Sequence, residues 1–374
     1  MKKRIIALLC AAVMALSLAG CTISSTPSTV GTIGETEITS GMYLLSQYQG
    51  YFSALEAANA QTPAEGETLP AYAQMPVKDF LKETITVNDE ETLVSDYVAA
   101  QTMKNIQYFA AVDAAFTALN GELSEEDIAA ADANAQSIWS ANEALYKKNG
   151  FSLATVQQYQ YSLSKADALM QLVYGENGTE AVSDDELKAH LDEDLWFVYY
   201  SAVPVYNTQN FQITDENTAK VTEICQKALD DFNAEKETTD DVYQLFRNKM
   251  TSGLPAAYEA LGNTYVPEAA LSSQLLNETS LNQYFSAESA QKIRDLENGE
   301  AVMLTDSGFA IELYQRVDPV ATGEWENLRE TALYTVYGEH LQDALIEYGT
   351  TLESKLDEGA MNKLPANKII PALG

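Results

Sequence analysis

Residues 196–205 read Trp-Phe-Val-Tyr-Tyr-Ser-Ala-Val-Pro-Val, a run of aromatic, β-branched and small side chains without a helical period. Such a run favours a buried strand, because flat and β-branched side chains pack well on a pleated surface. The chain before this run is helical in pattern, and the chain after it mixes helical and extended segments. The sequence therefore predicts an α+β protein rather than an all-helical one.

Amphipathic helices dominate the chain before residue 196. Their apolar side chains recur at helical spacing, and Ser, Thr or an Asn-Gly pair stands where a helix begins or ends. A short strand at residues 30–33 and a turn precede the first helix, and the Pro-rich residues 61–76 are expected to form a loop. The predicted helices cover residues 39–55, 94–119, 124–149, 153–173 and 183–194.

Shorter elements follow residue 205, and then a long helix. An apolar stripe at helical spacing covers residues 325–352 and predicts an amphipathic helix that buries one face in a core. Residues 253–267 carry no regular pattern. Helices are predicted at residues 214–232 and 239–249, and strands at 301–304 and 308–317.

The first residues have the features of an export signal. A basic head at residues 2–4 is followed by an apolar run at residues 5–18 and by Leu-Ala-Gly-Cys at residues 18–21. As a helix the apolar run would be about 21 Å long, which is short of the roughly 30 Å hydrocarbon core of a bilayer. The last four residues resemble a bacterial lipobox. This resemblance implies that residues 1–20 are a signal peptide and that the thiol of Cys21 is diacylglycerylated.

An ordinary secretory signal is the alternative, because Ala15, Ser17 and Ala19 fit a small-residue cleavage pattern. Residues 21–30 are Ser/Thr-rich and are expected to form the lipidated tether. The predicted location is the bacterial cell membrane, with the protein lipid-anchored on its extracytoplasmic face.

Composition excludes several classes of function. The 374 residues are too many for one small domain, and they carry 22 basic against 55 acidic side chains, a net charge of -33. This charge repels phosphate backbones, so nucleic-acid binding is not expected. His190 and His340 are the two histidines of the sequence, which leaves little material for histidine metal sites or catalytic triads. The acidic pairs lack the spacing of a calcium loop, and no metal or cofactor is predicted.

Cysteine usage fits an exported protein without a disulfide. Cys10 lies in the leader and Cys21 is the expected lipidation site, so Cys225 is the single thiol left in the body of the chain. It stands in a helical pattern between Ile224 and Gln226 and is expected to be buried rather than reactive.

Three stretches resemble SurA-type and PrsA-type extracytoplasmic foldases. Residues 31–39 (GTIGETEIT), which lead into a helix, resemble the opening of the chaperone domain of that family. Residues 150–187 resemble the last helices of that domain and the entry to a parvulin-type prolyl isomerase module. Residues 296–300 (LENGE) and 307–317 resemble the end of that module, where a Gly-Glu turn precedes a final strand.

The resemblance implies a mostly helical chaperone-like domain built from N- and C-terminal segments, with an inserted parvulin-like α/β module. The helical domain would cover residues 31–194 and the module residues 195–318. Residues 319–374 would contribute a helix that packs back on the N-terminal domain. The implied partners are unfolded or extended exported polypeptides, and a homodimer is one form that the family takes.

The sequence departs from the family at its catalytic positions. Active parvulins carry one histidine in the first strand of the module and another after Gly-Tyr or Gly-Phe in the last, where this chain has Tyr199 or Tyr200 and Ala310. Phe309 is retained as an apolar wall, and the Gly-rich loop has only a faint counterpart at residues 261–265. Tyr199, Tyr200 and Phe309 are therefore the candidate pocket residues.

These departures favour a chaperone or foldase-like holder without efficient prolyl isomerase catalysis. Isomerisation breaks no bond and crosses a barrier of about 18–20 kcal/mol, so a dry pocket that holds a twisted amide suffices without a nucleophile. An active isomerase with an altered pocket is therefore one alternative. A surface solute-binding lipoprotein is another, although the sequence lacks the alternating strands and helices of a doubly wound fold.

Overall fold

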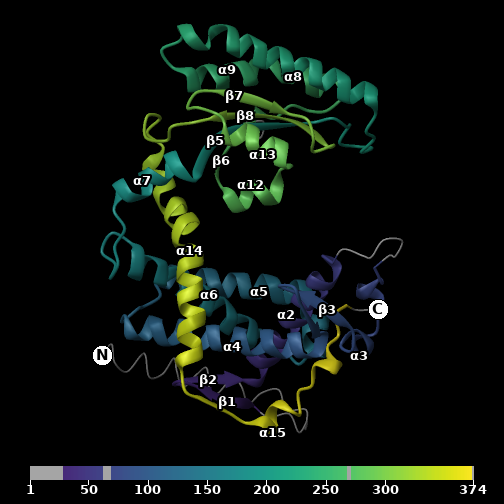
Figure 1. Ribbon diagram of the computed structural model, residues 1–374, viewed down its shortest axis with the longest axis vertical. Coiled ribbons are helices and arrows are strands. Elements are labelled where there is room, and N and C mark those ends of the chain that lie inside the picture. The colour runs from purple at the N-terminus through teal and green to yellow at the C-terminus, as the bar shows by residue number, and fades with distance from the viewer. Residues whose placement is uncertain (1–27, 62–68, 268–270, 373–374) are drawn as a thin grey trace. The chain divides into compact units, whose positions relative to one another are not determined.

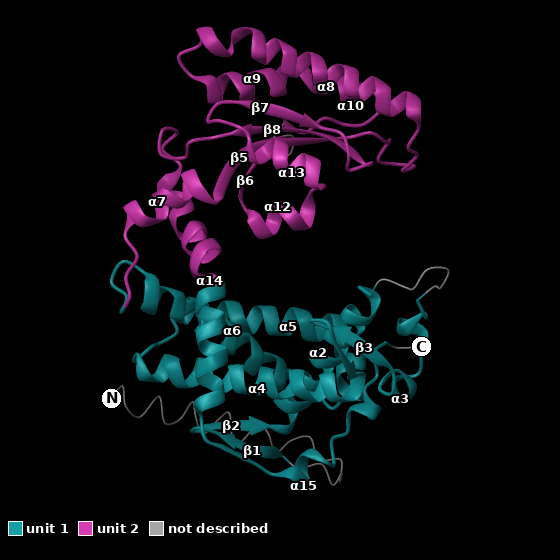
Figure 2. Cartoon of the chain, viewed as in Figure 1, with its two compact units in different colours: residues 1–179, 339–374 teal, residues 180–338 magenta. Residues whose placement is uncertain are grey.

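The computed structural model describes residues 28–61, 69–267 and 271–372. The expected signal peptide and Cys21 lie outside these residues. The chain divides into two compact units, with boundaries at residues 179/180 and 338/339 (Figure 2). Unit 1 contains both ends of the chain and unit 2 is inserted between them. The α+β class, with one unit assembled from N- and C-terminal segments, is confirmed.

Unit 1 is mainly helical. Its longest helices fall where the apolar periods predict them, and the predicted helix starts at Thr39, Ser124 and Ser152–Leu153 coincide with observed N-caps. The elements are β1 Thr29–Ile33, β2 Thr36–Thr39, α2 Ser40–Asn59, η1 Tyr72–Gln74, α3 Val77–Phe80, β3 Thr84–Val87, β4 Glu90–Leu93, α4 Val94–Ala118, α5 Glu125–Lys148, α6 Leu153–Tyr174, β9 Ser354–Leu356, α15 Glu358–Met361 and η3 Ala366–Lys368. Helix α14, Trp325–Thr351, crosses the boundary between the two units.

The three long helices α2, α4 and α6 pack on one another, and α5 packs on α6. The apolar clusters of this unit include one around Tyr51, Phe80 and Ile85, one around Ile38 and Ile106, and a smaller one around Trp139 between α5 and α6. The C-terminal residues close the first cluster, since Ile369 is buried within it. The end of the chain therefore forms part of the same core as its first helix.

A three-stranded antiparallel sheet of order β2-β1-β9 lies beside these helices and joins the first described strand to one near the C-terminus. The strand β1 begins at Thr29, so residues 29 and 30 belong to the body and the expected tether is shorter. Gly31 has a φ of 125° and its Cβ would lie 2.3 Å from the carbonyl oxygen of Lys355. Only glycine allows β9 to approach so closely.

Unit 2 holds the strand run that begins at residue 195. Its elements are α7 Asp184–Glu193, β5 Leu195–Pro204, α8 Asp215–Glu235, η2 Lys236–Thr238, α9 Val242–Gly253, α10 Pro255–Ala260, β6 Ser272–Asn277, α12 Glu278–Tyr284, α13 Ala287–Arg294, β7 Ala301–Leu304 and β8 Ala310–Arg316. The predicted strand at 196–205 is confirmed as β5, and β7 and β8 occupy the other two predicted strands. β6, α10, α12 and α13 were not predicted, and α10 lies within residues 253–267, where a helix of six residues is too short to show a regular sequence pattern.

The four strands form one antiparallel sheet of order β6-β5-β8-β7, with β5 and β8 at its centre. Figure 1 shows α8 and α9 over one face of this sheet and α12 and α13 over the other. Side chains of β5 alternate between the faces. Phe197, Tyr199 and Val203 enter the core under α8 and α9, whereas Trp196 and Val198 enter the core under α12 and α13.

The helix α7 and the beginning of α14 belong to unit 2, so its bounds extend beyond residues 195–318 on both sides. The reason is a set of polar contacts made by Arg316 and Asp184. The Arg316 guanidinium donates to the carbonyl oxygens of Leu191 and Leu195. Asp184 accepts from Arg329 at 2.6 Å and from the Trp325 indole at 3.1 Å.

Candidate functional site

The candidate site lies on the face of the four-stranded sheet that carries α12 and α13. In the β5–β8 register Tyr200 is opposite Tyr314, and Ala202 is opposite Glu312. Directly opposed residues of an antiparallel pair point to the same face, so these four side chains share it. The core cluster on this face includes Tyr314, with Tyr200 packed against it.

A cavity of about 390 Å³ opens on this face. Its walls come from β6, from the α12–α13 connection, from β8 and from the turn that precedes β8. The lining residues are Gln274, Tyr284, Phe285, Ser286, Asp306, Ser307, Glu312 and Tyr314. These described side chains carry aromatic, hydroxyl, carboxyl and amide groups, so the cavity combines an apolar surface with hydrogen-bonding groups.

Aromatic rings form the floor of the cavity. The rings of Tyr200 and Tyr314 stack with their centroids 5.6 Å apart and their planes inclined by 16°. Phe285 meets Tyr314 edge-on at 5.6 Å. Tyr314 is 4% exposed, whereas Tyr284 at the mouth is 66% exposed. The floor is therefore rigid and packed, and the mouth presents an accessible ring.

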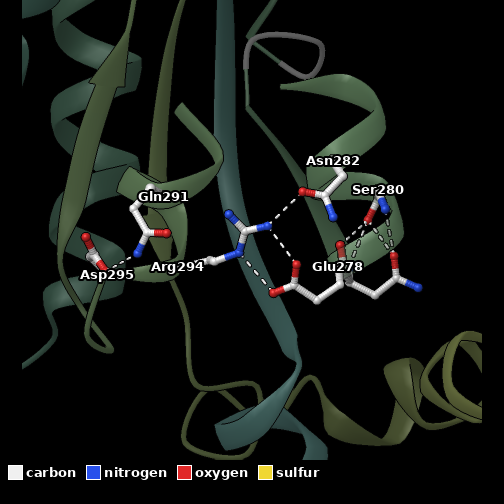
Figure 3. A network of polar contacts seen from close by, with 7 residues as sticks. Glu278, Ser280, Asn282, Gln291, Arg294 and Asp295 are labelled. Atoms are coloured by element: carbon white, nitrogen blue, oxygen red, sulfur yellow. Dashed lines mark hydrogen bonds and ion pairs between the residues drawn. The ribbon is translucent and has the colours of Figure 1, made fainter. Parts of the chain in front are cut away.

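A polar network holds the two short helices that carry this wall (Figure 3). Arg294 of α13 donates from Nε and Nη2 to the two carboxylate oxygens of Glu278 at 2.9 and 2.6 Å, and from Nη2 to Asn282 at 3.0 Å. Ser280 and Asn277 form a capping box at the start of α12. Because Glu278 and Asn282 belong to α12, the arginine ties α12 to α13 and fixes the lining residues between them.

Two carboxyl groups with opposite pKa shifts lie in the cavity. Burial raises the pKa of the Glu312 carboxyl, and the charge of Asp306 raises it further. Tyr314 is the hydrogen-bond donor to Glu312, and burial first, then Glu312, raises the pKa of its phenol. A hydrogen bond from Ser286, with another from Ser289 at 2.8 Å, lowers the pKa of Asp306.

The residues that the sequence singled out lie in three different places. Tyr200 stacks on the cavity floor. Tyr199 is on the opposite face, where its hydroxyl donates to Glu324 at 2.8 Å and the Arg247 guanidinium lies 4.2 Å from its ring centre. Phe309 is 65% exposed and lies at the end of the β5–β8 pair, where its carbonyl accepts from the Val205 amide at 3.0 Å. Ala310 is opposite Pro204.

Sequence reasoning did not find Glu312, Tyr314, Asp306 or Phe285. The alternation of residues 310–316 carries a signal for two of them, since Ile311 and Leu313 take one face and leave Glu312 and Tyr314 on the other. The α12–α13 wall carries a signal too, because Asn277 and Ser286 are helix-capping residues before short helical segments.

Neither a metal-binding cluster nor a membrane-spanning helix occurs among the described residues. Within the ranges given above, no group of three or more His, Cys, Asp or Glu side chains is placed to hold a metal ion. In the same part of the chain, no helix combines the length and the hydrophobicity that crossing a bilayer requires. Cys225 is fully buried in α8, and burial raises the pKa of its thiol to about 12.

These features define an α+β protein in which a sheet unit with an aromatic, acidic cavity is inserted into the sequence of a helical unit. No family model matches the chain, and no curated protein does. Among solved structures, the foldase protein PrsA from Streptococcus pneumoniae aligns with 76% of this chain and 98% of its own. The sequence identity is 12% and the TM-score is 0.34. That protein bears the name of one of the two foldase types that the sequence resembles.

Proposed function

We propose that this protein is an extracytoplasmic chaperone of the foldase type that binds extended segments of newly exported polypeptides. The observation that carries the proposal is the aromatic cavity on the face of the unit 2 sheet that carries α12 and α13. The cavity combines an exposed ring at its mouth with buried rings on its floor. Sites for unfolded chains need such apolar surface that remains accessible in the folded protein.

Small apolar side chains extend this surface along the strands. Ala202, Pro204 and Ala310 follow Tyr200 and Glu312 on this face of β5 and β8. From Tyr200 to Pro204 the strand advances about 13 Å, which matches about four residues of an extended peptide. The cavity and this strip together offer one anchoring pocket and a flat surface for the neighbouring residues.

Efficient prolyl isomerisation is not part of the proposal. The two positions at which the parvulin resemblance expects imidazoles carry other side chains, and none of the described lining residues is a histidine. Tyr314 is kept protonated because burial raises the pKa of its phenol, so it acts as a hydrogen-bond donor and not as a base. These groups can therefore hold a polypeptide without speeding rotation about its prolyl bonds.

The anchoring of the protein is also a proposal. It rests on the Leu-Ala-Gly-Cys sequence at residues 18–21, which follows an apolar segment with a basic head. Lipidation of Cys21 would hold the two units at the extracytoplasmic face of the membrane, where exported chains emerge unfolded. Mass spectrometry of the protein purified from a bacterial membrane tests the anchor, and replacement of Cys21 by Ser is the matched control.

Two assays on protein that lacks residues 1–21 test the chaperone proposal. We expect it to suppress aggregation of an unfolded test protein at near-stoichiometric ratios and to leave the cis–trans rate of a Xaa-Pro peptide almost unchanged. Tyr200→Ala and Phe309→Ala should weaken the suppression, whereas Tyr199→Phe, on the other face of the sheet, should not. A large acceleration that Tyr200→Ala abolishes would instead establish an active isomerase. Absence of both activities would overturn the proposal.

A further inference from the structure

The charges around the cavity are unequally distributed. Asp306 and Glu312 line it, and no lysine or arginine is among the described residues that do. Lys292 is the nearest base with an electrostatic effect on Asp306, and its ammonium is paired with Glu288 at 2.8 Å. A ligand that enters the cavity therefore meets two carboxyl groups without a neutralising side chain in the wall.

The Glu312 carboxylate can accept further hydrogen bonds. A carboxylate offers about four lone-pair sites, and the Tyr314 hydroxyl donates to one of them. The cost of keeping this half-buried group charged is visible in its raised pKa, which a cation in the cavity would offset. Aromatic faces beside the carboxyl groups add to the same preference, because a ring face attracts a cation.

We propose that the cavity takes the ammonium or guanidinium group of a Lys or Arg side chain in an extended polypeptide. This inference rests on the proposed function, since it names the kind of client residue that the sheet surface selects. The long apolar stem of such a side chain suits the rings of Tyr284 and Phe285, and its charged end reaches Glu312. The residues that flank it would then lie along Ala202 and Pro204.

A matched set of peptides tests the selection. The peptides are extended, apolar and fluorescently labelled, and they differ at one central position, which is Lys, Arg, norleucine or Glu. Binding to protein without residues 1–21 is measured by fluorescence anisotropy at low salt. We expect the Lys and Arg peptides to bind about tenfold more tightly than the norleucine peptide, and the Glu peptide to bind most weakly.

Two variants distinguish the effect of the cavity carboxylate on Lys binding from the effect of the protein's overall negative charge. Glu312→Gln should remove most of the Lys advantage, and the norleucine peptide should still bind to it, which also shows that the pocket is folded. Glu259→Gln removes an exposed carboxylate on α10, which belongs to the other side of the sheet, and should leave the advantage intact. Blocked lysine added alone should compete only at millimolar concentration.

The outcomes distinguish this inference from the function on which it rests. Equal binding of the Lys and norleucine peptides, or a Lys advantage that survives Glu312→Gln, overturns the inference and leaves polypeptide binding standing. Failure of every peptide to bind overturns the proposed function as well. Blocked lysine that binds as tightly as the Lys peptide would make the ligand a free amine and would also refute the proposal.

Discussion

Tyr200 and Tyr314 lie opposite each other on the two central strands of the sheet, and their rings stack at 5.6 Å with planes 16° apart. Tyr314 lines the cavity and is 4% exposed, and Tyr200 packs against it. A hydrogen bond from Tyr314 lowers the pKa of Glu312, the next residue on the same face of β8. The stacked pair therefore lies beside the carboxyl group that we propose to select the client residue.

The first prediction concerns pH. Burial and the charge of Asp306 raise the pKa of Glu312 above its ordinary value of 4.5, so this carboxyl takes up a proton at a higher pH than an exposed glutamate does. The preference for the Lys peptide should therefore be full at neutral pH and should fall as the pH decreases toward 4.5. Anisotropy titrations with the Lys and norleucine peptides at several pH values measure it.

The other groups around Glu312 decide how complete that loss is. Asp306 has a lowered pKa and stays charged through this range, and Tyr314 stays neutral because the pKa of its phenol is raised. A small residual preference should therefore persist at pH 4.5. A preference that is constant from pH 7.5 to 4.5 would show that Glu312 does not carry the selection.

The second prediction separates the hydroxyl of Tyr314 from its ring. Tyr314→Phe removes the hydrogen bond that lowers the pKa of Glu312 and keeps the stacked ring. The pKa of Glu312 should rise, so the loss of the Lys preference should move to higher pH. The peptide titrations of the preceding prediction, repeated on this variant, test it.

Tyr200→Phe is the matched control for this change. It removes the other hydroxyl of the same stacked pair and leaves the Tyr314 hydroxyl in place. The pH profile should stay that of the unmodified protein. Equal shifts in both variants would mean that disturbance of the stack, rather than the lost hydrogen bond, alters Glu312.

The third prediction concerns the α12–α13 wall. Arg294→Gln removes the two bonds to Glu278 and the bond to Asn282, which join α13 to α12 (Figure 3). Since Phe285 and Ser286 connect those helices, peptide affinity should fall several-fold while the thermal midpoint changes little, because exposed ion pairs stabilise weakly. Peptide anisotropy and thermal unfolding followed by circular dichroism measure the two effects.

Lys292→Gln is the control for a lost basic residue on α13. Its partner Glu288 lies on the same helix, so this pair does not join α13 to α12. Peptide affinity should stay within about twofold of the unmodified protein. A loss as large as that of Arg294→Gln would indicate a general effect of charge on α13 and not a loosened wall.

Long elements were predictable from the sequence because they repeat their pattern several times. Helix α4 covers 25 residues and α6 covers 22, so each shows its apolar stripe through many turns. The helices α12 and α13 have seven and eight residues, which is too short for a period to stand out. The strand β9 has three residues, and its pairing with β1 joins positions more than 300 residues apart.

The site was less accessible to prediction than the fold. Which of Tyr199 and Tyr200 faces the cavity depends on the register of β5 against β8, and a run that is apolar on both faces does not reveal its register. The acidic residues posed a different difficulty. Glu312 and Asp306 are two among 55 acidic residues, and only the fold of the turn before β8 brings them together.

The fourth prediction concerns the stability of unit 2. Phe232 of α8 and Phe246 of α9 are both fully buried, and their rings meet edge-on at 5.5 Å. Phe232→Ala should lower the free energy of unfolding of this unit by about 3–5 kcal/mol, because it leaves a cavity in a packed core. Phe309→Ala, which removes an exposed ring of the same unit, should lower it far less.

The tryptophans allow this unit to be followed separately. Trp139 belongs to unit 1, whereas Trp196 and Trp325 belong to unit 2, and the sequence contains three tryptophans. In a Trp139→Phe background, urea unfolding monitored by tryptophan fluorescence reports on unit 2. A midpoint that Phe232→Ala leaves unchanged would contradict the packing described for α8 and α9.

The fifth prediction uses the one thiol of the protein that lacks residues 1–21. Cys225 is fully buried in α8, and burial raises the pKa of its thiol to about 12. Since the thiolate is the reactive form, labelling of the folded protein at pH 8 by a disulfide reagent should be at least a thousandfold slower than in urea.

An exposed thiol at Ala234→Cys on the same helix, in a Cys225→Ala background, should react at once. Phe232→Ala should speed the labelling of Cys225, because a less stable unit opens more often. Fast labelling of the unmodified folded protein would show that α8 is not packed as described.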